Sequence, residues 1–417
     1  LSIILCVSFT GCMENYLDLY PEDKITSASF PENESDIKLL LNGVYAQLRE
    51  KEVYNQGLFG FGITDGATPN AFNWGTDEVF NKLGAGRLSS SDGGVVTYRW
   101  KRCYEIISRA NYLLACMDLV DLSEEAKAKY SGETHFLRGL AYSVLAETYG
   151  GVPIILTNIS TEEARSLKRA SLEETWQQAL DDYEVAITNL GVDAPEPGRA
   201  TKGAALGMKM RAYLYQGKYK EVLACVEQID ALKKYGLFHS YEGLFDPANE
   251  NNKEVLFDIQ YIEGENSQGS YIDQYCGTGT GSWTRGSRYV PTDDLVAAYE
   301  TIDGSPVDPE NPYENRDPRL GFTAVLPGSY FLGYRFPNYL YPGGAFNHAG
   351  NRLKHLSTRK YRIQDESKLP PSGQSYINDI ILRYADVLLS KAEAIIETNG
   401  NVADAIAILN RIRTERD

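Results

Sequence analysis

TKGAALGMKMRAYLYQ (201–216) and YKEVLACVEQIDALK (219–233) are consecutive segments joined by the dipeptide Gly217-Lys218. Both are rich in alanine and other small residues, which allow antiparallel helices to approach closely. A second pair of segments, 376–398 and 402–415, has a similar size and is also joined by a short turn. Two helix–turn–helix units of this kind predict a scaffold of stacked helical pairs.

Three further segments have the spacing of amphipathic helices. The apolar residues of 171–190 keep to one face of a helix, and 102–118 and 124–149 continue the pattern. Ser171 and Glu174 form a capping box at the start of the first segment. The predicted fold class is therefore mostly α, with helical pairs of the tetratricopeptide (TPR) type as the scaffold.

Two long segments lack this periodicity and predict a second, irregular lobe. Residues 54–98 and 262–375 are rich in Gly, Asn, Asp and aromatic side chains, and 254–261 has the composition of a short strand. Long segments without helices tend to be functional or disordered, and the aromatic content argues against disorder. We expect ordered loops with short strands, packed on the helices.

The expected domain organisation follows from these segments. Residues 12–261 form an N-terminal helical part that carries a ligand loop near 54–98. Residues 262–375 form the loop-rich lobe, and 376–417 form a C-terminal helical pair.

The chain opens with LSIILCVSFTGC (1–12), an apolar run that ends at Cys12 and is followed by acidic sequence. Eleven residues are too few to span a bilayer, which takes about 20. They are typical of the apolar core of an export signal, and Gly11-Cys12 is typical of a bacterial lipoprotein cleavage site. We expect 1–11 to be a partial signal peptide and Cys12 to carry the lipid. An ordinary cleaved signal or a buried strand is the alternative.

Composition excludes several classes of protein. The chain has 41 Lys and Arg against 57 Asp and Glu, a net charge of −16, which disfavours nucleic acid and adsorption to anionic lipid. We therefore expect membrane attachment through the lipid anchor only.

Cys103 and Cys116 lie about 20 Å apart on one predicted helix and cannot form a disulfide. Four scattered histidines give no zinc signature, so we expect neither a metal nor a cofactor.

Several recognisable stretches follow one another from end to end of the chain. They are LDLYPEDKIT (17–26), LNGVYAQLR (41–49), RAN (109–111), HFLRGLAYSVLAETYGGVPII (135–155), LFDPANENNKEVLFDIQY (244–261), RDPRL (316–320), RKY (359–361), LRYADVLLSKAEAIIETNG (382–400) and NRIRTERD (410–417). None is decisive alone, but the ordered set resembles the SusD/RagB family of outer-membrane nutrient-binding lipoproteins. Family members usually continue beyond this last helix, so we expect a chain truncated at both ends.

The resemblance implies a non-catalytic protein that binds glycan at the cell surface and delivers it to a SusC-like TonB-dependent porter. It places the protein at the outer membrane, lipid-anchored and surface-exposed. A peptide or another nutrient is the alternative ligand, because part of the family is not devoted to sugars. A glycoside hydrolase would need two suitably spaced carboxylates, and chance pairs among the acidic residues leave that reading open. A TPR-type protein-binding scaffold is the third reading.

Loops that combine aromatic rings with Asp, Asn and Arg are the candidate glycan sites, because rings cover the apolar faces of sugars and polar groups bind the hydroxyls. GFGITDGATPNAFNWG (60–75) and CGTGTGSWTRGSRYV (276–290) have this composition. The candidate residues are Asp65, Asn70, Phe72, Asn73, Trp74, Trp283, Arg285, Arg288 and Tyr289. For Trp74 and Phe72, packing between the lobes is the alternative role.

Four other features of the sequence carry candidate or structural residues. GSYFLGYRFPNYLYPGGAFNH (328–348) offers Tyr330, Tyr334 and Tyr339, although many of its rings should serve packing. DGSPVDPENPYENRD (303–317) carries Asp303, Asp308, Glu310 and Asn311, oxygen ligands that suit calcium, but its spacing fits a solvated acidic turn better. Arg316 and Arg319 flank Asp317-Pro318 and predict a structural turn. Trp100 and Trp176 lie on helix faces and are expected in the core.

Overall fold

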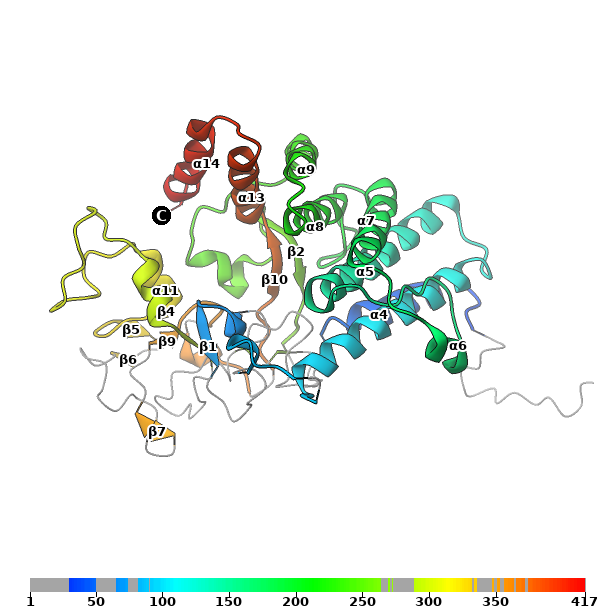
Figure 1. Cartoon of the computed structure of the whole chain (residues 1–417), viewed down its shortest axis with the longest axis horizontal. Helices are drawn as coiled ribbons and strands as arrows, with labels where there is room; N and C mark the ends of the chain where they lie inside the picture. Colours follow the sequence, from blue (N-terminus) through cyan, green and yellow to red (C-terminus); the bar gives the residue numbers. More distant parts are fainter. Residues whose placement is uncertain are drawn as a thin grey trace, which may run out of the picture.

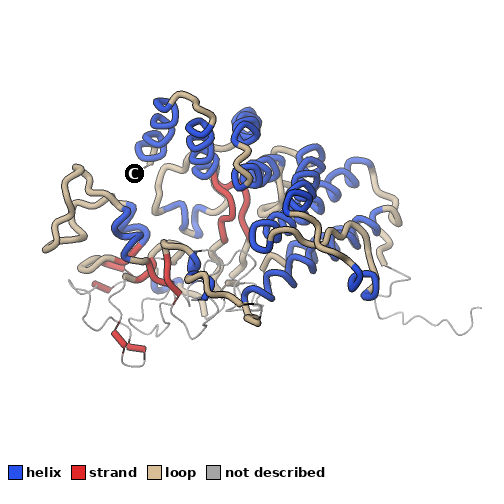
Figure 2. The backbone as a smooth tube through the Cα atoms, in the orientation of Figure 1, coloured by secondary structure: helices blue, strands red, loops and turns tan. Residues whose placement is uncertain are grey.

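The computed structural model describes residues 30–49, 65–73, 82–89, 91–263, 269–270, 272, 289–331, 334–335, 347–348, 351–352, 356–363, 365–371 and 374–416. The described chain is mostly helical, and its strands are short (Figure 1). Helices gather in one body, and loops and short strands form a second lobe beside it (Figure 2). The predicted fold class is confirmed.

The elements have the following bounds. The helices are α1 (Glu34–Ala46), α4 (Val95–Met117), α5 (Glu124–Tyr149), α6 (Thr161–Ser166), α7 (Leu172–Asn189), α8 (Lys202–Tyr215), α9 (Tyr219–Ala231), α11 (Asp293–Ala298), α12 (Arg319–Thr323), α13 (Tyr384–Glu397) and α14 (Val402–Thr414). The strands are β1 (Ala71–Asn73), β2 (Val255–Ile259), β3 (Tyr289–Pro291), β4 (Ala324–Val325), β5 (Tyr330–Phe331), β6 (Tyr334–Arg335), β7 (Asn347–His348), β8 (Asn351–Arg352), β9 (Ser357–Thr358) and β10 (Asp379–Arg383). Short 3-10 turns include η1 (Asp65–Ala67).

The predicted helical pairs are present and stack on one another. α8 and α9 form the pair of the central repeat, and α13 and α14 form the C-terminal pair. α13 packs against α9 and α8, so the two pairs are neighbours in space although 180 residues of chain (219–398) lie between their turns (Figure 1). The capping box of Ser171 and Glu174 is confirmed at the start of α7.

α5 is the central helix of the body. It packs along α7 and α4, and it buries residues on every side. Its Arg138 forms an ion pair with Asp182 of α7, at 2.7 Å between Nη2 and Oδ1, and also donates to Asn111 of α4. Burial of both charges is possible because each has hydrogen-bond partners. One polar network therefore links three helices inside the apolar core.

The two tryptophans expected in the core take different positions. Trp176 is 6% exposed and lies in the core of the helical body. Trp100 is half-buried at its edge, where its ring lies 5.0 Å from that of Tyr104 and 5.2 Å from that of Tyr149. Cys103, Cys116 and Cys225 are free and buried, as expected for small apolar side chains; Cys6, Cys12 and Cys276 lie outside the described residues.

The predicted start of the first helix in the C-terminal pair is wrong. The helix expected over 376–398 begins only at Tyr384, because 379–383 form strand β10. β10 pairs antiparallel with β2, and Asp379 lies opposite Ile259 at one end of the pair. Because β2 is buried, its backbone N–H and C=O groups need a partner strand. This tertiary pairing outweighs the helical pattern of the sequence. The strand expected within 254–261 is confirmed.

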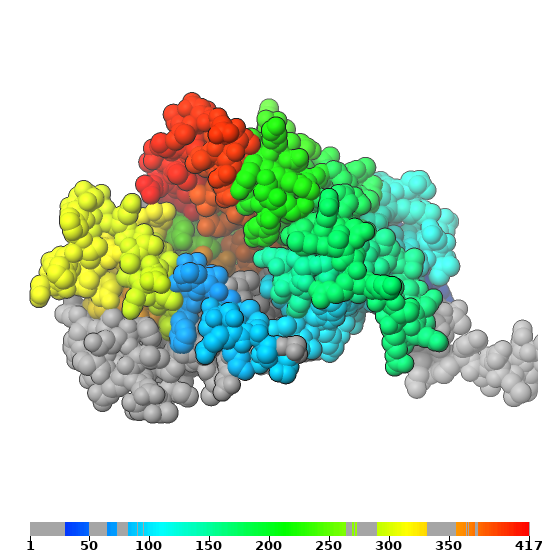
Figure 3. Space-filling model, in the orientation of Figure 1, coloured from blue at the N-terminus to red at the C-terminus, as the bar shows by residue number. Residues whose placement is uncertain are grey.

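The two-stranded β2–β10 ribbon lies between the helical body and the loop-rich lobe, and β10 leads directly into α13 (Figure 1). In the space-filling view, residues 289–331 and the helical body form separate masses, with parts of the chain recessed between them (Figure 3). Within the described residues, every helix is too short or too polar to cross a bilayer.

Candidate functional site

The described parts of the two candidate loops meet in one pair of strands. β1 lies within the first loop and β3 begins at the end of the second, and the strands pair antiparallel. Phe72 is opposite Val290, and Asn73 is opposite Tyr289. The backbone N–H of Thr292 also donates to the carbonyl of Asn70 at 3.1 Å. Directly opposite residues in such a pair have neighbouring side chains, so the ribbon brings together two candidate segments from opposite halves of the chain.

Three of the nine candidate residues, Asp65, Asn70 and Phe72, have described side chains. Phe72 is 40% exposed, and Asp65 and Asn70 line a cavity. Asn73 and Tyr289 have described backbone but not described side chains. Trp74, Trp283, Arg285 and Arg288 lie outside the described residues.

A cavity of about 140 Å³ lies next to the β1–β3 ribbon. Its polar lining includes the Tyr299 hydroxyl, which is hydrogen-bonded at 2.8 Å to the Thr323 hydroxyl. Leu295 and Pro291 add apolar surface. Within the part of the chain that the structure describes, the lining is Asp65, Asn70, Ala71, Tyr241, Pro291, Leu295, Tyr299, Thr323, Thr358 and Lys360. Hydroxyl groups, one amide, one carboxylate and one ammonium group beside apolar surface suit a polyhydroxylated ligand.

Positive charge surrounds Tyr241 in this cavity. Burial alone would raise the pKa of its phenol, but the nearby cations, led by Lys360 and Arg383, lower it below the usual range. The Lys360 ammonium also lies 4.5 Å from the centre of the Phe245 ring. These contacts fix a cation at the wall of the cavity, where it can donate hydrogen bonds to a ligand.

The third candidate loop is described only in part. Tyr330 is 68% exposed on β5, which pairs with β6. The side chain of Tyr334 and the whole of Tyr339 lie outside the described residues. β9 lies next to β3 and pairs with β4. The described strands of the loop-rich lobe thus form short two-stranded ribbons near the cavity.

The acidic segment 303–317 uses its carboxylates for turns. Asp303 accepts from the Ser305 backbone at 3.0 Å, and Asp308 accepts from the Glu310 backbone and the Asn311 amide, each at 2.9 Å. Hydrogen bonds from Ser305 lower the pKa of Asp303 to about 2. Among the described residues, no group of three His, Cys, Asp or Glu side chains is placed to hold a metal ion.

The two arginines of the RDPR segment hold this lobe together. Arg316 is 7% exposed and donates to the backbone carbonyls of Tyr299 and Pro312, at 2.6 and 2.7 Å. Arg319 pairs with the carboxylate of Asp317. The prediction of structural pairing and a turn is confirmed.

Sequence reasoning missed several residues of the cavity wall. Tyr241, Tyr299 and Lys360 come from three separate segments, and none has a spacing that points to a site. Lys360 belongs to RKY (359–361), a stretch of the family resemblance that does not by itself indicate a binding residue. Composition could identify the aromatic loops, whereas their neighbours in space depend on how the lobe folds.

Comparisons with known proteins agree with this architecture. A family model described as "SusD family" matches residues 253–415, and one described as "Starch-binding associating with outer membrane" matches 15–214. SusD-like protein P25 of Formosa agariphila is 26% identical over 448 residues, which cover 99% of this chain and 80% of that protein.

Solved structures are similar over most of the chain. A SusD-like carbohydrate binding protein of Bacteroides fragilis is 27% identical, with a TM-score of 0.80 over 92% of this chain and 78% of its own. A laminarin binding SusD-like protein is 20% identical, with a TM-score of 0.72 over 92% of this chain and 84% of its own, and shares the fold. Stacked helical pairs that carry a looped lobe are the architecture of the SusD class. The chain is a member of the SusD-like family.

Proposed function

We propose that the protein binds glycan at the β1–β3 ribbon and passes it, unaltered, to a SusC-like TonB-dependent transporter of the outer membrane. The pairing of β1 with β3 carries this proposal, because it joins two loops that are rich in aromatic and hydrogen-bonding residues. The similarity to a SusD-like carbohydrate binding protein at 27% identity supports a sugar as the ligand.

The ribbon supplies the two contacts that a sugar requires. The exposed ring of Phe72 can cover the apolar face of a pyranose, as we expect of Trp74 and Trp283 from the sequence. The cavity beside it offers Asn70 and Asp65 to hydroxyl groups. A shallow site of this kind holds a ligand without positioning a nucleophile, so we expect no turnover of the glycan.

Attachment to the outer membrane is proposed to depend on Cys12. The description of the family model that matches 15–214 associates such proteins with the outer membrane. A lipidated Cys12 would provide the attachment, with the protein exposed at the cell surface. Replacement by Cys12→Ser should move the expressed protein from the membrane fraction to the soluble fraction. Unchanged partition into detergent would contradict the anchor.

Affinity gel electrophoresis with a panel of polysaccharides tests the ligand and the site together. The wild-type protein should be retarded by at least one glycan, and Phe72→Ala, Trp74→Ala and Trp283→Ala should each weaken binding. Loss of one stacked ring should cost about 1 kcal/mol or more, which is about fivefold in affinity. Tyr112→Ala, on the outer face of α4 and 39% exposed, is the matched control. Retardation that none of the three substitutions changes would place the site elsewhere.

The proposed partner and the absence of catalysis have separate tests. Gentle solubilisation of the native membrane should co-purify a large β-barrel protein that mass spectrometry identifies as a TonB-dependent transporter. Purified protein incubated with its best glycan should release no reducing sugar. Release of sugar would favour the hydrolase reading, and binding of peptides but no polysaccharide would favour the alternative ligand.

A further inference from the structure

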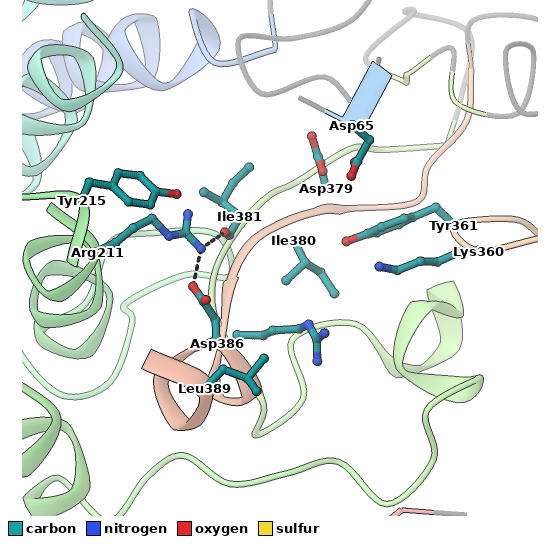
Figure 4. A pocket seen from close by; sticks show the side chains of 11 residues that line it. Asp65, Arg211, Tyr215, Lys360, Tyr361, Asp379, Ile380, Ile381, Asp386 and Leu389 are labelled. Carbon is teal, nitrogen blue, oxygen red and sulfur yellow. Dashed lines mark hydrogen bonds and ion pairs between the residues drawn. The ribbon is translucent and has the colours of Figure 1, made fainter. Parts of the chain in front are cut away.

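A second and larger cavity lies between the helical body and the loop-rich lobe. Its volume is about 370 Å³, and β10 crosses it (Figure 4). Arg211 and Tyr215 of α8 reach into it from one wall, and the polar ends of Lys360 and Tyr361 point toward them from the opposite wall. The cavity thus presents polar groups from both lobes to one space.

Two of the cations in this cavity already have partners. The Arg211 guanidinium donates to Asp386 at 2.6 Å and to the carbonyl of Ile381 at 2.9 Å. Arg383 pairs with the fully buried Glu254 at 2.9 Å. These pairs hold α8, β10 and α13 in place. Hydrogen bonds to a ligand would therefore come from other side chains of the wall.

Two side chains of the wall have polar groups without a partner among the described residues. The Asp379 carboxylate and the Tyr215 hydroxyl accept or donate no hydrogen bond within that part of the chain. Burial, together with the neighbouring carboxylate of Asp65, raises the pKa of Asp379 to about 7, so near neutral pH its carboxyl group can both donate and accept. Tyr215 is 53% exposed, and its ring is open to stacking.

Shared residues connect this cavity to its neighbours. Asp65 and Lys360 line both this cavity and the one beside the β1–β3 ribbon. Tyr215 and Arg211 also line a smaller cavity of about 110 Å³ on the helical body. The two cavities are therefore neighbours that share a wall at Asp65 and Lys360, and Tyr215 lies across the larger cavity from Lys360 (Figure 4).

The charges of the cavity select the kind of ligand. Among the described residues, the lining carries three acidic side chains (Asp65, Asp379 and Asp386) and three basic ones (Arg211, Lys360 and Arg383), so it contains both signs and no excess of basic groups. A polyanion such as a sulfated or uronate-rich glycan would be repelled by the Asp65 carboxylate and by the ionised form of Asp379. Neutral hydroxyl groups can instead donate to a carboxylate and accept from an ammonium group.

We propose that the cavity between the lobes is a second binding region for the same glycan chain. It takes neutral, hydroxyl-rich sugar units beyond those held at the β1–β3 ribbon. This inference rests on the proposed glycan-binding function and extends it. It implies that long chains bind more tightly than short ones, and that Tyr215 and Asp379 contribute only when the chain is long enough to reach them.

Isothermal titration calorimetry with neutral oligosaccharides of increasing length tests this inference. The probes are malto- and laminari-oligosaccharides, from the disaccharide upward. Affinity should rise with length, and Tyr215→Ala should weaken binding of the longest chains by about fivefold while it leaves that of the shortest unchanged. Asp379→Asn, which keeps the size of the side chain, should act in the same direction. Tyr112→Ala should change neither.

The outcomes separate the two proposals. Binding that Trp74→Ala or Phe72→Ala weakens, but that Tyr215→Ala and Asp379→Asn leave unchanged at every length, overturns the second region and leaves the ribbon site intact. Tighter binding of a sulfated chain than of its desulfated form also overturns it. If neither the oligosaccharides nor any polysaccharide of the panel binds, the glycan-binding function itself fails.

Discussion

Phe72 lies directly opposite Val290 in the β1–β3 pair, although the two residues belong to opposite halves of the chain. Val290 is 2% exposed and Phe72 is 40% exposed. One member of the pair therefore anchors the ribbon in the lobe, and the other is accessible to a ligand. The stabilising role of Val290 can therefore be tested separately from the proposed binding role of Phe72.

Substitution of each member should have a different effect. Phe72→Ala should lower glycan affinity by about fivefold and change the free energy of unfolding by less than about 1 kcal/mol, because the ring is accessible. Val290→Ala should lower the free energy of unfolding by about 1–3 kcal/mol, because it removes buried methyl groups. Calorimetry and urea unfolding measure the two effects. A large loss of stability in Phe72→Ala would make the ring a packing residue.

The buried ion pair of Arg138 and Asp182 should be essential for the helical body. Both side chains are at most 7% exposed, so Asp182→Ala would leave an uncompensated charge in the core. The expected loss is about 3–5 kcal/mol. Lys38→Ala removes an exposed pair with Glu196 and should cost less than about 1 kcal/mol. Urea unfolding compares the two variants, and equal losses would contradict the role assigned to the buried pair.

Gly151 should resist substitution because of a close approach between two backbones. A Cβ atom at this position would lie 2.0 Å from the carbonyl oxygen of Ala170, whereas at Gly191 the nearest atom would be 3.6 Å away. Gly151→Ala should therefore destabilise the protein by about 1–3 kcal/mol. Gly191→Ala should stay within about 0.5 kcal/mol of the wild type. Thermal unfolding of both variants measures the difference, and a neutral Gly151→Ala would show that the segment can move apart.

Stability should fall as the pH rises from about 4 to about 7. Burial raises the pKa of both Asp379 and Glu250 to about 7, so the folded protein keeps protons that the unfolded chain has already lost. Where the folded state binds more protons, the free energy of unfolding decreases with rising pH, and it levels off above the folded pKa. Urea unfolding at several pH values tests this.

The variant Asp379→Asn isolates one of these two groups. Its side chain does not titrate, so the fall in stability between pH 4 and pH 7 should be smaller than in the wild type. Asp193→Asn, at a carboxylate that is 90% exposed, serves as the control and should keep the wild-type slope. A slope in Asp379→Asn that equals the wild-type slope would assign the proton to another group.

Helix positions were readable from sequence where local signals agree. α5 has the predicted bounds because Ser123 caps its first turn and Gly150, with φ at 74°, ends it. α4 begins at Val95, seven residues before the predicted start, because its buried face continues toward the N-terminus through Tyr98. The sequence predicts helix where the structure has β10, since the pairing of β10 with β2 depends on a strand more than a hundred residues away.

The sequence alone determined the helical scaffold, the capping signals, the family resemblance and the composition of the two aromatic loops, because each depends on residues close together in the chain. Only the tertiary structure decided that these loops pair at Phe72 and Val290 and that Lys360 and Tyr241 stand beside them. The same holds for the cavity that joins Asp379 to Tyr215. Such neighbours depend on how the two lobes pack on either side of the β2–β10 ribbon. The periodicity of side chains along the sequence carries no information about contacts between residues so far apart in the chain.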